Sequence, residues 1–412
     1  MSVSEILQAA KAAAPIIARA STDQKNLVLS QLAKLLETNS QAITSANQID
    51  IEIGKSTLST GLIDRLTLTK ERIQSLADSL KTIIDLADPI GESLQGLTLS
   101  NGLKLQQVRV PLGVVGCIYE ARPNVTIDIA ALAIKSGNAA VLRGGSAAEN
   151  TNRVLVGLIQ SALSQAGLPK ASVQTIDEFG REGASELMQA RGLVDVLIPR
   201  GSANLIHAVV HDSKVPVIET GDGVVHIFVD ESADLETVVP IVINSKTQRP
   251  SVCNALETLL VHKAVASRVI PRVGEALIKA GVTIHGCSET QKLIDCVAAT
   301  EEDWSTEYYS LDLSVKVVED LDAALAHIAK YSTHHTESIL TNDISHAERF
   351  LSEVDAAVVM VNASTRFTDG GEFGFGAEVG ISTQKLHARG PMGLRELTSS
   401  KWLVRGSGQV RS

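Results

Sequence analysis

Val114-Val-Gly-Cys-Ile-Tyr119 is an apolar run of strand length, and Ala139-Ala-Val-Leu-Arg143 is a second one further along the chain. The segment 125–135 between them has a helical pattern. A strand, a helix and a second strand in this order predict a parallel βαβ unit, the building block of a doubly wound sheet. The alternation continues, so we expect an α/β lobe here, with helices at 151–166 and 203–210 and strands at 194–199, 215–219 and 224–229.

The rest of the chain extends this pattern on both sides. Before residue 90, apolar residues recur with helical period, which predicts a helical cover at 4–18, 24–36 and 70–86. After residue 235 a second α/β series follows, so we expect two doubly wound α/β lobes. The strand candidates of the second series are 258–262, 313–319, 338–341 and 356–362.

The segment 96–110 alternates in polarity around Asn101-Gly102, which is a strong hairpin signal. An isolated hairpin is only marginally stable in water. We therefore expect this hairpin to pair with another element or with another subunit.

Composition excludes several classes of protein. The formal net charge is −10 over 412 residues, which argues against nucleic acid and against an anionic membrane surface as partners. No apolar run reaches the roughly 18 residues that span a bilayer. The four cysteines lack the spacing of metal ligands, and no signal peptide is evident, so we expect free thiols in the cytoplasm.

Cys253 differs from the other cysteines in its sequence context. It lies in Lys246-Thr-Gln-Arg-Pro-Ser-Val-Cys-Asn254, among cationic and turn-forming residues. Cysteines are usually packed as small apolar residues, whereas nearby cations and partial exposure favour the reactive thiolate. We expect Cys253 to be a nucleophile in a loop. Taken alone, a loop cysteine without a function would be the simpler interpretation.

Several familiar motifs fail on their spacing or context. Gly54-Lys55-Ser56 lacks the first glycine of a phosphate loop, and the glycines at 374, 376 and 380 do not have dinucleotide-binding spacing. His207 and His211 lack the glutamate of a zinc helix, and His334-His335 has no further ligand nearby, which favours a solvated loop. We therefore expect no metal site.

Two strand ends offer another kind of phosphate site. Arg143-Gly-Gly-Ser146 and Arg200-Gly-Ser202 each precede a predicted helix, where backbone N–H groups and the helix dipole favour an anion. Glycine and serine are also ordinary helix caps. Two such sites at successive strands are harder to explain by capping alone.

The order of these segments resembles the aldehyde dehydrogenase superfamily. Four segments are similar to the branch of that superfamily that acts on L-glutamyl 5-phosphate. They are distributed over most of the length of the chain. They are 61–69, Tyr119-Glu-Ala-Arg-Pro-Asn-Val125, 246–254 and 387–398.

The resemblance implies an activity. It is the NADPH-dependent reduction of L-glutamyl 5-phosphate to L-glutamate 5-semialdehyde with release of phosphate, the second step of proline biosynthesis from glutamate. Cys253 would form a thioester with the acyl group. Asn124 would stabilise the tetrahedral oxyanion, although without the resemblance it would be taken for a turn residue or a helix cap.

The resemblance also implies the cofactor site. Arg143, Gly144 and Ser146, with Gly201 and Ser202, would bind NADPH. NADPH is favoured over NADH because no carboxylate lies between Arg143 and Ala148, so that Arg143 can pair with a 2′-phosphate. Glu307 resembles the glutamate that positions the nicotinamide ribose. A surface carboxylate is the alternative for Glu307.

The substrate contacts follow less directly. Arg249, Arg366 and the turn 369–372 are candidates because they lie in cysteine-adjacent or glycine-rich loops. Glu219 resembles the base that activates water in aldehyde oxidation, a step that phosphate release does not need, so Glu219 could equally support the fold.

The resemblance divides the chain into three parts. They are an NADPH-binding domain at 1–97 and 114–228, a catalytic domain at 229–394, and a small β oligomerisation flap at 98–113 and 395–412. A homodimer or homotetramer follows from the flap. Because an acyl phosphate hydrolyses readily, a transient contact with glutamate 5-kinase is a hypothesis.

Two alternatives stay open. One is an aldehyde dehydrogenase in which coenzyme A or water accepts the acyl group, and a screen of cofactors and acceptors would decide. The other is a non-catalytic protein that binds a nucleotide or forms a structural oligomer, which an unreactive thiol at neutral pH would favour.

Overall fold

The computed structural model describes residues 1–411. The chain forms two compact units. The first unit contains Met1–Thr220, Gly374–Gly380 and the segment from Met392 onward, and the second contains Gly221–Phe373 and Ile381–Pro391. The second unit begins at Gly221 rather than at residue 229, because the strand 225–229 pairs within the sheet of the second unit.

The first unit opens with helices whose ends are defined by their caps. Ser2 and Ser21 each accept a hydrogen bond from the third residue of the following helix, and the Glu5 and Gln24 side chains return the bond in two capping boxes. The apolar face of the first helix packs on the parallel sheet through Ile6, among others. These helices are α1 (Val3–Ile17), α2 (Thr22–Thr38), α3 (Ser40–Gly54), α4 (Thr60–Leu66) and α5 (Lys70–Asp85).

The parallel sheet of the first unit has the strand order β5-β4-β3-β6. The chain moves outward from β3 through β4 to β5 and then returns to place β6 on the other side of β3. The carboxyl ends of β3, β4 and β6 thus meet at a topological switch point, where open α/β sheets bind ligands. The strands are β3 (Val114–Tyr119), β4 (Ala139–Arg143), β5 (Val173–Thr175) and β6 (Val196–Arg200), and the helices are α6 (Pro123–Lys135), α7 (Glu149–Gln165), α8 (Gly180–Gln189) and α9 (Ala203–Asp212).

One predicted strand of this unit is wrong. Segment 215–219 forms only an isolated bridge, between Val217 and Leu197. Pro216 has no N–H that could donate a hydrogen bond to a neighbouring strand. The segment therefore pairs with β6 only through the backbone hydrogen bonds on either side of this bridge.

The second unit has a seven-stranded sheet in the order β10-β9-β11-β8-β7-β12-β13, and every neighbouring pair is parallel. Alternate residues of β7 face opposite sides, so that Ile227 packs with α10 and α11 while Phe228 packs with α13 and α14. Strands are β7 (Val225–Val229), β8 (Leu256–His262), β9 (Thr283–Gly286), β10 (Val297–Ala298), β11 (Asp312–Val318), β12 (Thr336–Leu340) and β13 (Val358–Val361), and helices are α10 (Leu235–Thr247), α11 (Lys263–Lys279), α12 (Ser288–Gln291), α13 (Leu321–Tyr331) and α14 (Ile344–Glu353).

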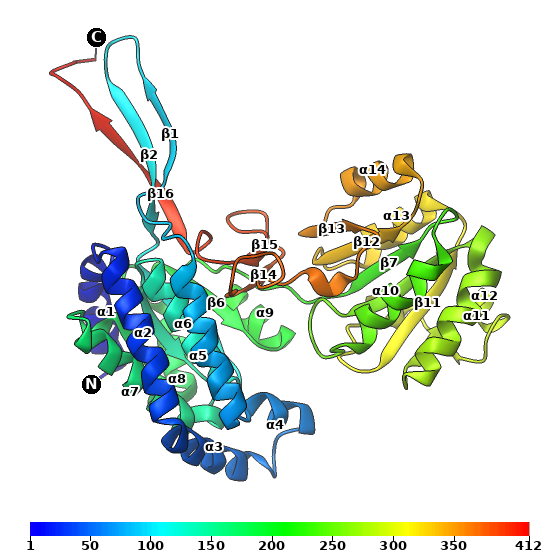
Figure 1. Ribbon diagram of the computed structural model, residues 1–412, viewed down its shortest axis with the longest axis horizontal. Coiled ribbons are helices and arrows are strands. Elements are labelled where there is room, and N and C mark those ends of the chain that lie inside the picture. Colours follow the sequence, from blue (N-terminus) through cyan, green and yellow to red (C-terminus); the bar gives the residue numbers. More distant parts are fainter. Residues whose placement is uncertain (412) are drawn as a thin grey trace. The chain divides into compact units, whose positions relative to one another are not determined.

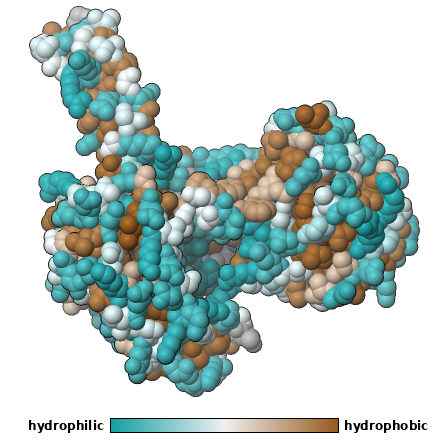
Figure 2. All heavy atoms as spheres, in the orientation of Figure 1, coloured by the Kyte–Doolittle hydropathy of each residue, from teal (hydrophilic) through white to brown (hydrophobic). Residues whose placement is uncertain are grey.

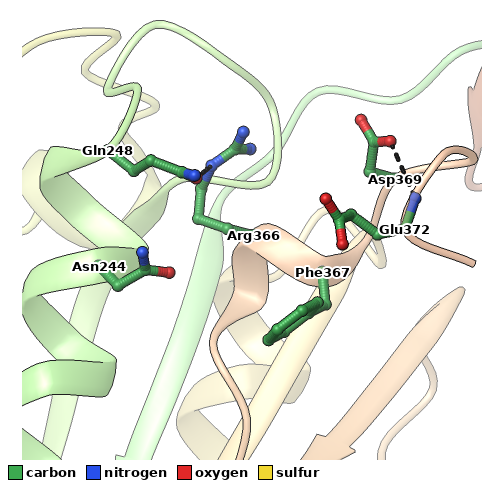
Figure 3. A pocket seen from close by; sticks show the side chains of 6 residues that line it. All are labelled: Asn244, Gln248, Arg366, Phe367, Asp369 and Glu372. Atoms are coloured by element: carbon green, nitrogen blue, oxygen red, sulfur yellow. Dashed lines mark hydrogen bonds between the residues drawn. The ribbon is translucent and has the colours of Figure 1, made fainter.

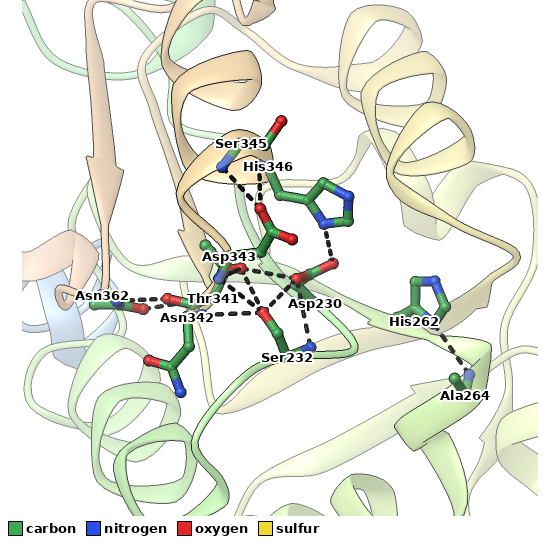
Figure 4. A network of polar contacts seen from close by, with 10 residues as sticks. All are labelled: Asp230, Ser232, His262, Ala264, Thr341, Asn342, Asp343, Ser345, His346 and Asn362. Atoms are coloured by element: carbon green, nitrogen blue, oxygen red, sulfur yellow. Dashed lines mark hydrogen bonds and ion pairs between the residues drawn. The ribbon is translucent and has the colours of Figure 1, made fainter.

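A polar network fastens the carboxyl ends of β7 and β12 to α14 (Figure 4). The buried carboxylate of Asp230 accepts hydrogen bonds from Thr341 Oγ1 at 2.7 Å and from Ser232 Oγ at 2.8 Å, and it pairs with His346 Nδ1 at 3.0 Å. Burial opposes ionisation of Asp230, but these partners outweigh it and hold its pKa below the ordinary value. The network therefore locks this end of the sheet.

The predicted hairpin forms and pairs with the C-terminal segment. β1 (Ser93–Thr98) and β2 (Lys104–Pro111) are antiparallel, and β16 (Thr398–Arg405) adds to β2. Gly102 has a φ of +86°, as the turn requires. The three strands project from the helices of the first unit (Figure 1), and apolar side chains are visible along them (Figure 2). The part of the predicted flap at residue 412 lies outside the described residues.

Candidate active site

Cys253 lies in the turn between α10 and β8, as its sequence context predicts. Its side chain is half-buried. The backbone of this turn packs on Gly223, where an added Cβ would lie 1.5 Å from the Cys253 carbonyl oxygen. By contrast, Cys117 is fully buried in β3, and burial raises the pKa of its thiol to about 12. Cys253 therefore has the more accessible thiol of the two, on a closely packed turn.

The turn that carries Cys253 is joined at its two ends by a buried ion pair. Lys246, in the last turn of α10, places its Nζ 2.6 Å from Oε2 of Glu257 on β8, and both side chains are fully buried. Burial raises the pKa of Glu257 to about 8, against the attraction of Lys246. The ammonium of Lys246, one of the cations near Cys253 in the sequence, is therefore paired with Glu257.

Glu307 is not the surface carboxylate of the alternative interpretation. Burial raises its pKa to about 7, although the Tyr309 hydroxyl and the Gly223 N–H both donate hydrogen bonds to it. Its Oε1 is buried and has no hydrogen-bond partner among residues 1–411. Because Gly223 also contacts the Cys253 backbone, Glu307 and Cys253 share a neighbour.

A polar pocket of about 190 Å³ in the second unit is lined by Arg366 (Figure 3). Arg366 belongs to the short helix η5 (Thr365–Phe367), and its Nε donates to Gln248 Oε1 at 2.9 Å. Asp369 and Glu372 from the predicted turn also line the pocket. Arg249 is exposed and is absent from the lining, so the two predicted arginines have different surroundings.

In the first unit, Arg143 and Gly144 end β4. The Arg143 Nε donates to the Gly180 carbonyl at 3.3 Å, and the Gly144 N–H donates to Asp177 Oδ1 at 2.6 Å. Asp177 also accepts from Asn152 Nδ2 at 2.9 Å. Asp177 follows a neighbouring strand, so the sequence between Arg143 and Ala148 could not reveal it.

The helix after Ser146 begins differently from the prediction. Ser146 is exposed and opens the short helix η1 (Ser146–Ala148), which leads into α7. The first N–H groups of α7, from Asn150 and Thr151, donate to the buried carboxylate of Asp50 on α3 at 3.2 and 2.8 Å. These two N–H groups are thus committed, which corrects the expectation that they are available to a phosphate.

Gly201 and Ser202 connect β6 to α9, and Ser202 is the N-cap residue of this helix. Glu120, which follows β3, accepts hydrogen bonds from the N–H and the hydroxyl of Ser202, both at 2.9 Å. A Cβ on Gly201 would lie 2.8 Å from the Glu120 carboxyl group. The N-terminus of α9 therefore already attracts an anionic group, as its dipole predicts.

Asn124 lies in the first turn of α6 and is not its cap, since Arg122 occupies that position. Its Nδ2 donates to Asp128 Oδ2 at 3.2 Å. Burial raises the pKa of Asp128 to about 6, although the bond from Asn124 opposes the shift. Asp128 therefore fixes the orientation of the Asn124 amide, a role that the sequence did not indicate.

Within residues 1–411 no three His, Cys, Asp or Glu side chains are grouped so that they could hold a metal ion. No helix in this part of the chain is long and apolar enough to cross a membrane.

Comparison with known proteins identifies close relatives. The model of the aldehyde dehydrogenase family matches residues 1–291. The chain is 63% identical to the gamma-glutamyl phosphate reductase of Leifsonia xyli subsp. xyli, over 100% of this chain and 98% of the relative. It is 60% identical to the protein of that name from Clavibacter michiganensis subsp. michiganensis, over 98% and 94%. The crystal structure of gamma-glutamyl phosphate reductase from Thermotoga maritima superposes with a TM-score of 0.97 at 47% identity and covers 100% of both chains.

Proposed function

Because the chain belongs to the aldehyde dehydrogenase family and, within it, to the gamma-glutamyl phosphate reductases of proline biosynthesis, we propose that it reduces L-glutamyl 5-phosphate with NADPH through a thioester on Cys253. The products are L-glutamate 5-semialdehyde, NADP and phosphate. The observation that carries this proposal is the position of Cys253, half-buried in a turn that packs on Gly223 and is bounded by the Lys246–Glu257 pair.

The chemistry of Cys253 has two stages. Its thiolate forms a C–S bond to the acyl carbon while the C–O bond to phosphate breaks, and phosphate leaves with that electron pair. When bound, NADPH supplies the hydride that reduces the thioester carbon. The C–S bond then breaks, its electrons return to Cys253, and the aldehyde is released. The thiolate is regenerated, so Glu219 has no role in these reaction steps.

Asn124 is proposed to donate its amide N–H to the oxyanion that forms in each stage. An oxyanion donor must be oriented before the charge develops. The bond from Asn124 to Asp128 provides an orientation for the amide in the first unit. The loss of one such donor typically costs on the order of 100-fold in rate.

The residues fit a nicotinamide cofactor at two points. The unpaired, buried Oε1 of Glu307 suits a ribose hydroxyl, which can donate a hydrogen bond to it. A cofactor phosphate is proposed to bind at the N-terminus of α9, at Gly201 and Ser202, where it would take the place of the Glu120 carboxylate.

The proposal that the cofactor is NADPH is supported by the cationic side chain of Arg143. With Gly144 and Ser146, Arg143 is proposed to hold the adenosine end of the cofactor. The nearby carboxylate of Asp177 accepts hydrogen bonds from Gly144 and Asn152. Arg143 would supply the cation that pairs with a 2′-phosphate at this strand end.

Arg366 and Arg249 are proposed to contact the substrate. Among this pair, only Arg366 lines the polar pocket of the second unit. We also propose a cytoplasmic location and a transient contact with glutamate 5-kinase, which would limit hydrolysis of the acyl phosphate.

The protein is further proposed to form a homodimer or homotetramer that is held together by the flap of β1, β2 and β16. Exposed apolar side chains on a sheet with open edges support the oligomer.

The activity is tested in the reverse direction, as reduction of NADP with L-glutamate 5-semialdehyde. The proposal predicts a reaction that requires phosphate or arsenate, that is lost in Cys253→Ala and that is kept in the matched control Cys296→Ala. Turnover without an inorganic acceptor would identify a hydrolytic enzyme, and turnover with coenzyme A would identify an acylating one. No turnover with any acceptor would contradict the proposal.

A further inference from the structure

The pocket around Arg366 carries charges of both signs. Figure 3 shows Arg366 beside Gln248 on one side and the carboxylates of Asp369 and Glu372 on the other. Asp369 Oδ1 accepts from the Gly371 N–H at 2.8 Å, which holds the acidic turn in place. A pocket with a cation facing two carboxylates suits a ligand that itself carries an anion and a cation.

The floor of this pocket is fastened to the turn that carries Cys253. Thr365 Oγ1 donates to the Asn254 carbonyl at 2.7 Å, and Asn254 Nδ2 donates to the Thr368 carbonyl at 2.8 Å. All three side chains are buried. Arg366 lies between the two tethered threonines in sequence, and Asn254 follows Cys253 directly. The position of Arg366 relative to the thiol is therefore fixed by short, buried hydrogen bonds within one unit.

Arg366 also interacts electrostatically with Cys253. Partial burial lowers the pKa of the Arg366 guanidinium, while Asp369 and a Cys253 thiolate raise it. A guanidinium remains charged under such conditions. A permanent cation therefore lies within electrostatic range of the Cys253 side chain.

We propose that this pocket recognises the α-amino acid end of the substrate, with Arg366 binding the α-carboxylate and Asp369 and Glu372 binding the α-ammonium. The inference rests on the proposed function, and it adds which residues make the enzyme specific for a substrate with an α-amino acid end. A short methylene chain separates the reacting carbon of a glutamyl group from these two charges. The carboxylate suits the planar donor set of arginine, and the ammonium suits a pair of carboxylates.

The test compares three aldehydes in the phosphate-dependent reduction of NADP. L-Glutamate 5-semialdehyde carries both charges, 5-oxopentanoate lacks the ammonium, and pentanal lacks both. For Arg366→Gln we expect kcat/KM to fall by on the order of 100-fold with the first two and to be unchanged with pentanal. For Glu372→Gln and Asp369→Asn we expect a loss only with L-glutamate 5-semialdehyde.

Two controls separate recognition from folding. Arg366→Lys keeps the charge and should recover part of the lost kcat/KM, and Arg272→Gln, an exposed arginine of α11 that pairs with Glu236, should behave as the unaltered protein. Equal losses with all three aldehydes, or no loss with any, would overturn the inference.

A binding measurement separates this inference from the proposed function. Calorimetric titration of the unaltered protein with L-glutamate and with glutarate needs no turnover. If the protein binds L-glutamate more tightly than glutarate and Arg366→Gln abolishes this binding, the inference stands even when no aldehyde is oxidised. Turnover of L-glutamate 5-semialdehyde with unchanged kinetics in Arg366→Gln would refute the inference and leave the activity intact.

Discussion

Lys246 Nζ lies 2.6 Å from Glu257 Oε2, and this fully buried pair joins the two ends of the turn that carries Cys253. The Tyr308 ring centroid lies 5.8 Å from the same ammonium. A buried ion pair is costly to form but even more costly to break, because one partner is left as an uncompensated charge. The pair therefore favours one geometry of the turn over its alternatives.

Removing one partner of this pair should destabilise the protein strongly. At a pH above the pKa of Glu257, where its carboxylate is ionised, we expect Lys246→Met to lower the free energy of unfolding by about 3–5 kcal/mol. The double variant Lys246→Met/Glu257→Gln should recover much of this loss, because no charge remains buried. Urea unfolding measures both effects. Lys263→Met, which breaks the exposed pair with Glu319, should cost less than about 1 kcal/mol. Equal costs for the buried and exposed pairs would contradict the role assigned to Lys246.

Gly223 should tolerate no side chain. In Gly223→Ala the added Cβ would meet the Cys253 carbonyl oxygen at 1.5 Å, so the turn must shift. A shift of about 1 Å in a catalytic group can cost on the order of 100-fold in rate. We expect such a loss of kcat/KM and a changed rate of Cys253 alkylation. Gly157→Ala on α7, where nothing lies within 4 Å of the added Cβ, should keep full activity. Full activity in Gly223→Ala would show that the turn is not closely packed.

Glu307 should make stability depend on pH. Its pKa of about 7 lies above the ordinary 4.5, so the folded state holds the proton more tightly than the unfolded chain. Its contribution to stability is full below pH 4.5 and is lost as the pH rises through 7. At pH 8 we therefore expect Glu307→Gln to be more stable than the unaltered protein, by on the order of 2–3 kcal/mol. Exposed Glu348→Gln should show no such gain, and a pH-independent difference for Glu307→Gln would exclude a raised pKa.

The flap should hold subunits together. Leu97 on β1 and Val404 on β16 are exposed apolar residues on a sheet without a core of its own. We expect Leu97→Asp/Val404→Asp to reduce the molar mass measured by light scattering to that of one chain. Ile278→Asp, an equally apolar and exposed position on α11, is the matched control and should keep the oligomer. An unchanged mass in the flap variant would place the interface elsewhere.

Local patterns in the sequence predicted much of this structure. β3 and β4 have the predicted bounds, and the hairpin turns at Asn101-Gly102. Cys253 lies in a turn because Pro250 and Ser251 interrupt the apolar pattern between α10 and β8. In each case the signal lies within a few neighbouring residues, which is the range that hydrophobic period and turn chemistry cover.

The contacts that define the site could not be predicted in this way. Asp50 reaches α7, and Glu120 reaches Ser202, across about a hundred and about eighty positions of sequence. A pattern of neighbouring residues does not predict hydrogen bonds between residues so far apart in the sequence. His335 shows the same limitation, since it was predicted to lie in a solvated loop. It is fully buried, it contacts Thr336 Oγ1 at 2.8 Å, and burial lowers its pKa to about 4.

The thioester on Cys253 is tested most directly by a single-turnover experiment without phosphate. The protein is mixed rapidly with NADP and L-glutamate 5-semialdehyde, and the absorbance of NADPH is followed. The mass of the peptide that contains Cys253 is then measured by mass spectrometry. The thioester mechanism predicts a burst of about one NADPH per chain with a glutamyl adduct on Cys253, and steady turnover only after phosphate is added. A burst that persists in Cys253→Ser, or steady turnover without any acceptor other than water, would contradict it.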